Sequence, residues 1–578
     1  TGRLFREFGI VVAGSVIISS FVSLTLTPMM SSRLLRKKEK HGKFFKTIEK
    51  FLQKAIDGYS SSLTYFMKYR WLAFVLMAVS AGMILIFGMQ LQSELAPLED
   101  KGRLRIFATG PEGTSYELMD DYVVGMIKMA DTIPERASIL SVTAPSFGSS
   151  VSVNSGFVRL TLVPPNEREK SQAQIAEEFT KLIRDHNYAR AFVSQEETIA
   201  ASRTGGLPVQ FVIQATNFEK LSEYLPQFME RAQDDPAFSV VDLNLKFNKP
   251  ELQVEIDRDK ARKMGISVID IAETLQLLFS GQRFGYYIQD GKQYQVIGQA
   301  DRPNRSDPMD LRSVAVRNKD GQIVMLDNLV NISYQTSPPQ LYRFNRYVSA
   351  TVSGSPAPGL TVGDGIDAMQ RIADDVLDET FTTSLAGVSK DFSESSNSLL
   401  YAFLLALVLV YLVLAAQFES FRDPFIIMFT VPLALAGAVL SLYLFGHTLN
   451  IFSQIGIIVL VGIVTKNGIL IVEFANQRKE DGLDKFEAAI DAAAQRFRPI
   501  LMTSLATILG AMPIALAIGE ASTSRIPMGI VLIGGLIFSL ILTLYVIPTL
   551  YTYLTSVENK KTDESYIEEE EEKVVEYV

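Results

Sequence analysis

The chain has 578 residues, of which 48% are hydrophobic and 21% are charged, and its formal net charge is −9. A chain of this length exceeds one ordinary domain and is too apolar for a typical soluble protein, so we expect a membrane protein with a large soluble part. The acidic balance gives no indication of a nucleic-acid partner, and the lack of cysteine excludes disulfides and thiolate metal ligands.

Seven apolar segments are long enough, at the rise of an α-helix, to cross a bilayer. They are Ile10–Met30, Trp71–Leu91, Leu399–Ala416, Phe425–Phe445, Ile451–Ala475, Pro499–Gly519 and Ile526–Leu554. Basic residues such as Arg422 and Arg478 place alternate short loops in the cytoplasm, whereas the loop Gly446–Asn450 carries neither Lys nor Arg. With an odd number of spans, we expect the chain to start outside and to end inside.

The segment between the first two spans, residues 31–70, is basic and carries Phe44, Ile48 and Phe51 at helical spacing. This pattern predicts a cytoplasmic helix that lies on the membrane surface. A specific lipid-binding site is the alternative, but such surface helices are common and need no bound lipid.

No apolar run of membrane length occurs between residues 94 and 395, so this part is expected to be soluble and extracytoplasmic. Its first half is predicted to follow the order βαββαβ of a ferredoxin-like unit, with strands and helices at Arg103–Thr109, Ser115–Ile133, Ser138–Thr143, Phe157–Val163, Ser171–His186 and Arg190–Gln195. A second copy is predicted from the strands and helices at Val209–Gln214, Phe218–Gln233, Ser239–Lys246, Leu252–Ile256, Val348–Ser353, Val362–Leu377 and Thr382–Val388. Residues 257–340 interrupt this copy, and such an insertion usually projects toward another chain.

One predicted span carries a lysine deep inside it. At helical rise, Lys466 lies about 14 Å from the end of its segment at Ala475. A charged ammonium at this depth costs about 2.5 to 3.5 kcal/mol, so it requires an acidic partner. Glu473 is close enough to the segment end to reach the head groups. We therefore expect the partner of Lys466 to come from another segment or another chain.

Four stretches of sequence carry a family resemblance: Gly2–Phe8 (GRLFREF), Leu24–Met30 (LTLTPMM), Gly462–Ala475 (GIVTKNGILIVEFA) and Arg496–Ser504 (RFRPILMTS). They resemble the resistance-nodulation-division efflux transporters, and more narrowly the hydrophobe and amphiphile (multidrug) inner-membrane permeases. Against the twelve spans of that family, the chain resembles only the C-terminal half, from the sixth span onward. The implied fold is an α-helical membrane bundle with periplasmic α+β ferredoxin-like repeats and an inserted docking subdomain.

The resemblance also implies the domain boundaries. They are transmembrane helices at 1–30 and 71–93, a linker helix at 31–70, porter subdomains at 94–203 and at 204–256 with 341–395, a docking subdomain at 257–340, a five-helix transmembrane block at 396–555 and an acidic disordered tail at 556–578.

A proton relay is implied by the same resemblance. In this family a lysine matching Lys466 pairs with two aspartates of the fourth span, and residues matching Thr503 and Arg496 complete the relay; Asn467, next to the lysine, is counted with them. The function implied is drug/proton antiport driven by the proton-motive force, without a cofactor. The fourth span is not among the segments matched here. Without the motif, Thr503 would be expected to bond its own backbone, and Arg496 to follow the charge bias of cytoplasmic loops.

The substrate path is expected between the two α/β units. The gating loop of the family falls at Ala144–Ser155, with Phe147 and Gly148, and candidate wall residues are Phe157, Arg159 and Phe211. Each of these three aromatic or basic residues can equally be strand core or sheet surface. The partners implied are amphiphilic substrates, protons, two further copies in a homotrimer, a periplasmic adaptor (membrane fusion protein) and an outer-membrane channel, with the protein in the bacterial inner membrane.

Other chemistries have little support. The three histidines, His41, His186 and His447, are scattered and form no metal-binding pattern, and a glycine loop with a Walker lysine is missing, so we expect no metal site and no ATP use. Two alternatives stay open: a non-transporting assembly or protein-export factor of the same fold, and a metal-ion exporter. The second rests on Met119, Met126 and Met129, which share a helix face but fit core packing better.

Overall fold

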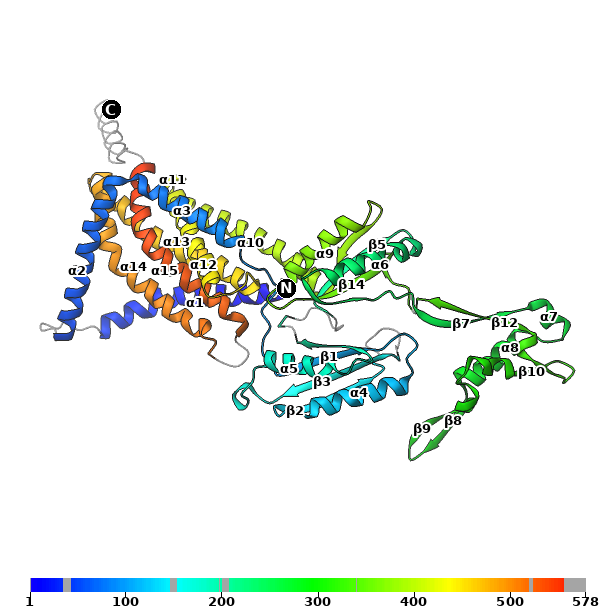
Figure 1. Ribbon diagram of the computed structural model, residues 1–578. Coiled ribbons are helices and arrows are strands. Elements are labelled where there is room, and N and C mark those ends of the chain that lie inside the picture. Colours follow the sequence, from blue (N-terminus) through cyan, green and yellow to red (C-terminus); the bar gives the residue numbers. More distant parts are fainter. Residues whose placement is uncertain are drawn as a thin grey trace, which may run out of the picture.

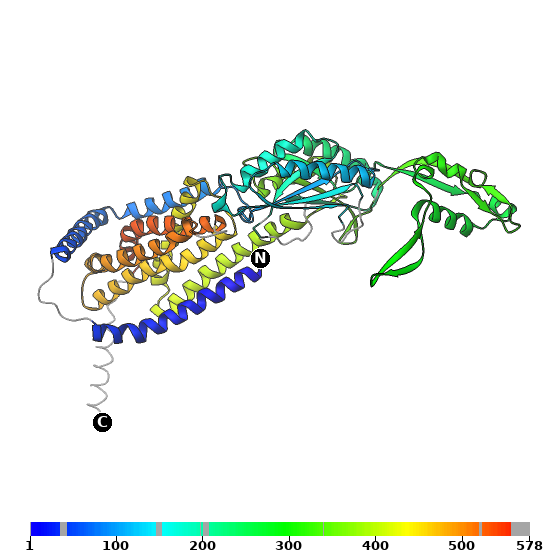
Figure 2. The same cartoon turned by 90° about the horizontal axis from the view of Figure 1, so that it is seen from below.

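The computed structural model describes residues 2–34, 43–145, 153–196, 198–199, 207–338, 340–518 and 523–555. Three parts follow one another along its length: a helical bundle, a pair of α/β units and a small outlying module (Figure 1). The view from below shows the same succession (Figure 2). This division follows from composition, because the long apolar segments gather in the bundle and the strands in the other two parts.

Seven helical segments of the described residues are long and apolar enough to cross a membrane, which agrees with the seven predicted spans. Six are single helices: α1 (Gly2–Leu34), α3 (Trp71–Gly88), α10 (Gly387–Phe418), α13 (Ile451–Glu480), α14 (Lys485–Ala515) and α15 (Ile526–Leu554). The seventh is broken at Phe429 into α11 (Arg422–Met428) and α12 (Thr430–Leu444). Helix α15 is central, since α12, α13 and α14 all pack against it.

Small residues allow α12 and α15 to approach closely. A Cβ atom placed on Gly534 would lie 2.4 Å from the Cβ of Ser441, and one on Gly437 would lie 2.4 Å from the Cβ of Phe538. Between membrane helices, where lipid and side chain are equally apolar, such close contact is a main source of attraction. The two glycines therefore set the distance between α12 and α15, the two helices against which α13 packs.

Helices α1, α10, α13 and α14 are longer than the apolar pattern predicted, and α1 and α14 illustrate this. Helix α1 continues through Pro28 to Leu34, and α14 starts at Lys485 rather than at Pro499. In α14 the extra turns bury Ala488, Ala489, Ala492 and Ala493 against the bundle. Hydropathy marks the part of a helix that matches the bilayer, and these turns continue the same helix beyond it on an alanine face.

Helix α2 (Lys43–Phe66) was predicted to be amphipathic, and it lies across one end of the bundle (Figure 1). Its second half is anchored there: Leu63 is fully buried, and the Tyr59 hydroxyl donates a hydrogen bond of 2.5 Å to the carbonyl of Leu544. Phe51 stays 72% exposed. One face of the helix thus packs on α14 and α15, and an aromatic residue on another face remains free for a membrane surface.

The first α/β unit contains β1 (Arg103–Thr109), α4 (Tyr116–Asp131), β2 (Arg136–Thr143), β3 (Ser155–Leu162), α5 (Gln172–Arg184) and β4 (Arg190–Gln195). Its four strands pair antiparallel in the order β2-β3-β1-β4. Helices α4 and α5 cover one face, where Met119, Met126 and Phe179 are fully buried with alternate strand residues. The other face carries the remaining strand residues and no helix of this unit (Figure 1).

The second unit contains β5 (Val209–Ala215), α6 (Phe218–Asp234), β6 (Phe238–Leu243), β13 (Arg343–Phe344), β14 (Tyr347–Pro356), α9 (Val362–Val376) and β15 (Thr382–Leu385). The prediction that Leu252–Ile256 belongs to this sheet is wrong. That segment lies in β7 (Lys249–Ile256), which pairs with β12 (Val330–Ser337) in a two-stranded ribbon. The sheet needs no strand there, because β14 pairs with both β5 and β6.

The β7–β12 ribbon leads to the outlying module (Figure 1). This module contains α7 (Arg258–Lys263), α8 (Val268–Leu275), β10 (Ala315–Arg317) and β11 (Ile323–Met325) around a small core, and the hairpin of β8 (Gln282–Gln289) and β9 (Lys292–Gly298). The alternating sequence Tyr286–Tyr294 around Asp290–Gly291 predicts a β-hairpin, and the structure confirms it. Both turn residues have positive φ, of 51° and 72°, as a two-residue hairpin turn requires.

Candidate functional site

Lys466 lies on the exposed face of α13, whereas its neighbours Thr465 and Asn467 are each 3% exposed. Among the residues that the structure describes, it forms neither an ion pair nor a side-chain hydrogen bond. The helix thus turns its polar and apolar neighbours into the bundle and presents the ammonium outward. A charge at this depth still requires an anionic partner, and α13 leaves room for one on that face.

Asn467 joins α13 to α14. Its side-chain Nδ2 donates a hydrogen bond of 3.3 Å to the Ser504 hydroxyl, and both residues are at most 4% exposed. Thr503 precedes Ser504 on α14, and it is half-buried. The Thr503 hydroxyl itself bonds the carbonyl of Ile500 at 3.3 Å. Asn467 is thus held in a buried contact between two helices, and Lys466 and Thr503 are the sequence neighbours of the two residues in this contact.

Arg496 lies farther from Ser504 along the same helix. It lies two helical turns before Thr503 on α14, about 10 Å along the axis. Its guanidinium carbon is 4.4 Å from the ring centroid of Phe474, and that of Arg478 is 5.0 Å from the same ring. Arg478 is also paired with Asp491 at 2.7 Å. The structure thus gives Arg496 a cation–π partner on α13 instead of a contact with Lys466.

A polar cluster missed by sequence reasoning connects α11, α13 and α15. Asn476 donates a hydrogen bond of 3.1 Å to the carboxylate of Asp423 and accepts one of 2.7 Å from the Tyr551 hydroxyl. Asp423 is 9% exposed and Tyr551 is fully buried. The sequence signal for this cluster is Asp423, an aspartate beside Pro424 at the start of an apolar run. Asp423 was not a candidate because the predicted span begins at Phe425.

Two carboxylates, the half-buried Glu94 and the buried Glu99, lie where the bundle meets the first α/β unit, on the segment between α3 and β1. Thr448 bonds Glu94, and the Ser524 hydroxyl donates a hydrogen bond of 2.8 Å to Glu99, which is 7% exposed. Burial raises the pKa of Glu94 above its usual value, and the hydrogen bond from Thr448 opposes part of that increase. On the same segment, the Leu95 carbonyl accepts the N–H of Ile451, the first residue of α13. The helix of Lys466 is thereby tied to the chain that enters the first unit.

The predicted wall residues fall in different environments. Phe157 and Arg159 lie on β3 and face away from α4 and α5, with the Arg159 guanidinium 5.8 Å from the Phe157 ring centroid. Phe107 stands next to Phe157 across the strands, with 5.3 Å between ring centroids. Phe211, in contrast, is 1% exposed in the core of the second unit, so it is not a wall residue. Phe147 and Gly148 of the predicted gating loop lie outside the described residues.

A cavity of about 530 Å³ opens between the two α/β units. It is lined from the first unit by Thr109, Gly110, Pro111, Glu112, Asn187, Tyr188 and Arg190, and from the second by Met229, Gln233, Asp242, Leu243, Lys246 and Asn248. Its volume is in the range of small-molecule sites, and its walls mix apolar and polar side chains. The cavity lies between the two units, where a substrate path was expected; the path itself stays a prediction.

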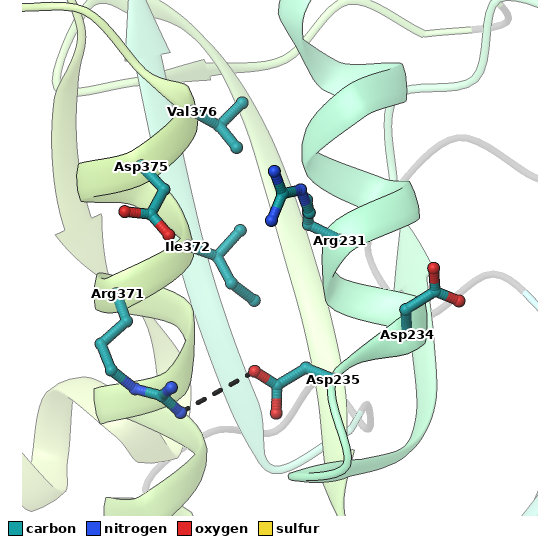
Figure 3. Close-up of a pocket in the computed structure, with 7 residues that line it drawn as sticks. All are labelled: Arg231, Asp234, Asp235, Arg371, Ile372, Asp375 and Val376. Carbon is teal, nitrogen blue, oxygen red and sulfur yellow. Dashed lines mark ion pairs between the residues drawn. The ribbon is translucent and has the colours of Figure 1, made fainter.

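A second, smaller groove of about 300 Å³ lies between the ends of α6 and α9 (Figure 3). Arg231, Asp234, Arg371 and Asp375 line it, and Arg371 pairs with Asp235 at 3.8 Å. Only Ile372 and Val376 add apolar surface. With so little apolar wall and charges of both signs, it suits an amphiphile less well than the cavity between the units.

Metal chemistry gains no support. In the described portion of the chain, no three His, Asp or Glu side chains gather as metal ligands. Met119 and Met126 are fully buried in the core of the first unit, so they do not line the cavity. Leu118 of the same helix is 44% exposed, because it points away from that core.

Comparisons with known proteins cover most of the chain. The model of the AcrB/AcrD/AcrF family matches residues 1–555. A protein of Haemophilus influenzae named "Uncharacterized transporter" is 33% identical over 567 residues, which cover 96% of this chain and 54% of that protein. The chain thus spans about half the length of the curated relative it matches.

Proposed function

Because the chain belongs to the AcrB/AcrD/AcrF family of transporters, we propose that it forms the C-terminal half of a proton-driven exporter of amphiphilic compounds. The observation that carries this proposal is Lys466, a lysine in a predicted span that faces outward without an acidic partner in the described chain. In this proposal, aspartates of an N-terminal half complete the site from the exposed side of α13.

The mechanism in this proposal depends on the pairing between the Lys466 ammonium and such an aspartate. When such an aspartate is ionised, its attraction to Lys466 draws the two helices together, and when it takes up a proton this attraction is lost. Proton flow then switches the bundle between two arrangements of these helices. Asn467 acts as a positioning residue in this scheme, because its bond to Ser504 fixes the rotation of α13. Thr503, the neighbour of Ser504, passes or holds a proton in this scheme.

The coupling to the soluble part is supported by two connections. Helix α10 runs without interruption from the end of β15 into the bundle, and Ile451 of α13 is bonded to Leu95 on the segment that enters the first unit. A shift of α13 or α10 is therefore transmitted to the cavity between the units, which we propose alternates between open and closed states. Arg496, held over Phe474 of α13, is a second contact between α13 and α14 in this scheme.

The remaining assignments follow from the family and from the exposed surfaces. We assign the two α/β units to a periplasmic ferredoxin-like porter domain and the outlying module to a docking subdomain. Its hairpin exposes Phe284, Tyr286, Ile288 and Ile297, which suits burial against a neighbouring copy in a homotrimer. An adaptor and an outer-membrane channel would complete a tripartite pump in the inner membrane of a bacterium.

The test replaces the lysine in the full-length protein. We expect Lys466→Met to abolish export of an amphiphilic dye, because the alternation of charge pairing is lost, so that dye accumulates in cells lacking their own exporters. Lys181→Met, which removes an exposed lysine of α5, is the matched control and should leave export unchanged. Dye levels that do not respond to Lys466→Met would refute proton coupling at this residue and favour an assembly or protein-export role.

A further inference from the structure

One arginine at an end of the bundle has aromatic partners but no acidic one. The half-buried Arg70 lies between α2 and α3, and its guanidinium carbon is 5.4 Å from the ring centroid of Phe486 on α14 and 5.8 Å from that of Tyr553 on α15. Within the described ranges this guanidinium has neither an ion pair nor a hydrogen bond. Asp484 caps α14 by accepting the N–H of Phe486 at 3.2 Å, and Glu487 is exposed. Two rings therefore fix the position of the guanidinium, and no carboxylate of this part of the chain neutralises it.

The position of Arg70 coincides with a membrane boundary. The candidate span of α3 starts at Trp71, the next residue, and the span that contains α15 ends at Leu554, the residue after Tyr553. Both boundaries lie at the end of the bundle away from the α/β units (Figure 1). Tyr69, Trp71 and Tyr553 are 49%, 59% and 47% exposed there. Exposed Trp and Tyr rings at the end of a span are typical of the lipid head-group region, so Arg70 is level with the head groups.

The anion that the head-group region supplies is the phosphodiester of a phospholipid. A guanidinium binds phosphate through two parallel hydrogen bonds, and a guanidinium already fixed by two rings loses less side-chain entropy on binding. The acyl chains of the same lipid can lie along α3, where Phe74, Val75 and Val79 are exposed. Inorganic phosphate offers the same oxygens but no acyl chains, so it would leave this apolar surface uncovered. The arrangement of charge and apolar surface therefore fits a lipid better than a free anion.

We propose that Arg70 is the anion-binding residue of a phospholipid site in the leaflet on the side away from the α/β units. The lipid phosphate neutralises the guanidinium, and the acyl chains cover the exposed face of α3. The bound lipid also joins three helices, because Arg70 lies beside Phe486 of α14 and Tyr553 of α15 while the chains extend along α3. The inference does not rest on the proposed export function, since none of these residues takes part in the proposed relay.

The binding test uses Trp71, the single tryptophan of these 578 residues, as its reporter. In detergent-purified full-length protein, with any other tryptophan replaced by phenylalanine, quenching of Trp71 fluorescence is measured with phosphatidylglycerol and with diacylglycerol. Both probes carry bromine on their acyl chains near the glycerol end. We expect phosphatidylglycerol to bind roughly tenfold more tightly than diacylglycerol, the size of one charge-assisted contact. Arg70→Met should abolish this preference and leave diacylglycerol binding unchanged, which shows that the fold is intact, and Arg70→Lys should retain part of it.

The matched control is Arg422→Met, because Arg422 is exposed and also starts a candidate span, but has no ring partner in the described chain. This variant should keep the preference for phosphatidylglycerol, and so should Lys466→Met, whose loss of export would then concern the export proposal alone.

Four results would overturn the lipid site. Equal loss of the preference in Arg70→Met and Arg422→Met would show a general attraction between basic residues and anionic lipid. No preference in the wild type would show that another part of the full-length protein covers Arg70. Displacement of the lipid by inorganic phosphate, beyond that by chloride at equal ionic strength, would assign a soluble anion. A preference that appears only after deletion of residues 556–578 would assign Arg70 to that acidic segment.

Discussion

The hydrogen bond between Asn467 and Ser504 gives the sharpest quantitative prediction. Both side chains are at most 4% exposed, and the distance of 3.3 Å is at the long end for an N–H···O bond. Such bonds between membrane helices contribute about 0.6 kcal/mol on average, so we take this value for the pair. It corresponds to a change of about threefold in an equilibrium constant.

The prediction is tested with a double-mutant cycle in the full-length protein. We expect Asn467→Ala and Ser504→Ala each to destabilise the fold, and Asn467→Ala to cost more because it also leaves a cavity. The double variant should be destabilised by about 0.6 kcal/mol less than the sum of the two. The free energy of unfolding is measured by titration with sodium dodecyl sulfate from mixed micelles.

The functional arm of the same cycle separates a positioning role from a relay role. If Asn467 only holds the rotation of α13, the two single variants should reduce dye export to a similar extent, and neither should match the complete loss expected for Lys466→Met. Strictly additive stabilities would show that the hydrogen bond contributes nothing. Complete loss of export in Asn467→Ala, with Ser504→Ala intact, would refute the positioning role and make Asn467 a relay member.

Two further predictions concern packing and pH. Gly534→Ala should lower the free energy of unfolding by about 1 to 3 kcal/mol, because the added Cβ would lie 2.4 Å from the Cβ of Ser441. Gly82→Ala is the control and should not destabilise the bundle, because its Cβ would meet nothing within 4 Å. Equal unfolding midpoints for the two variants would contradict this prediction. The effect of Glu94→Gln on stability should depend on pH only above the ordinary carboxyl pKa. Because burial raises the pKa of Glu94 in the fold, the folded state binds more protons than the unfolded chain between the two pKa values, so stability falls as pH rises through that window. The variant lacks this loss, so its advantage in unfolding midpoint over the wild type should grow from acidic to neutral pH; a constant difference would exclude Glu94 as the source.

Hydropathy and local turn chemistry predicted the elements well where a single physical requirement dominates. The seven long apolar segments were found because a bilayer imposes a fixed length, and the hairpin at Asp290–Gly291 because its turn requires positive φ at both residues. The same criteria missed the first turns of α14, where an alanine face packs without being hydrophobic enough to mark a span. They also assigned β7 to the wrong sheet, since a strand's partner depends on chain that is distant in sequence.

The candidate site, too, was predictable from the sequence only in part. Lys466 could be identified from the sequence, because a lysine in an apolar segment of membrane length is costly wherever the helix turns. Its outward orientation, the anchoring of Asn467 to Ser504 and the placement of Arg496 over Phe474 depend on how α13 and α14 are rotated against each other. That rotation is set by packing around α15, which involves many weak contacts and no local sequence signal.

The arginines of the first unit illustrate the limit most clearly. The predicted strands include Arg103, Arg105, Arg159 and Arg190, and of these only Arg159 was a candidate wall residue. The pairing of Glu196 with Arg105 and the position of Arg159 opposite that arginine appeared only once the strands were in register. A sequence specifies only the number and sign of the charged residues. The electrostatic energy of a site depends on the distances between them, and only the tertiary structure determines those distances.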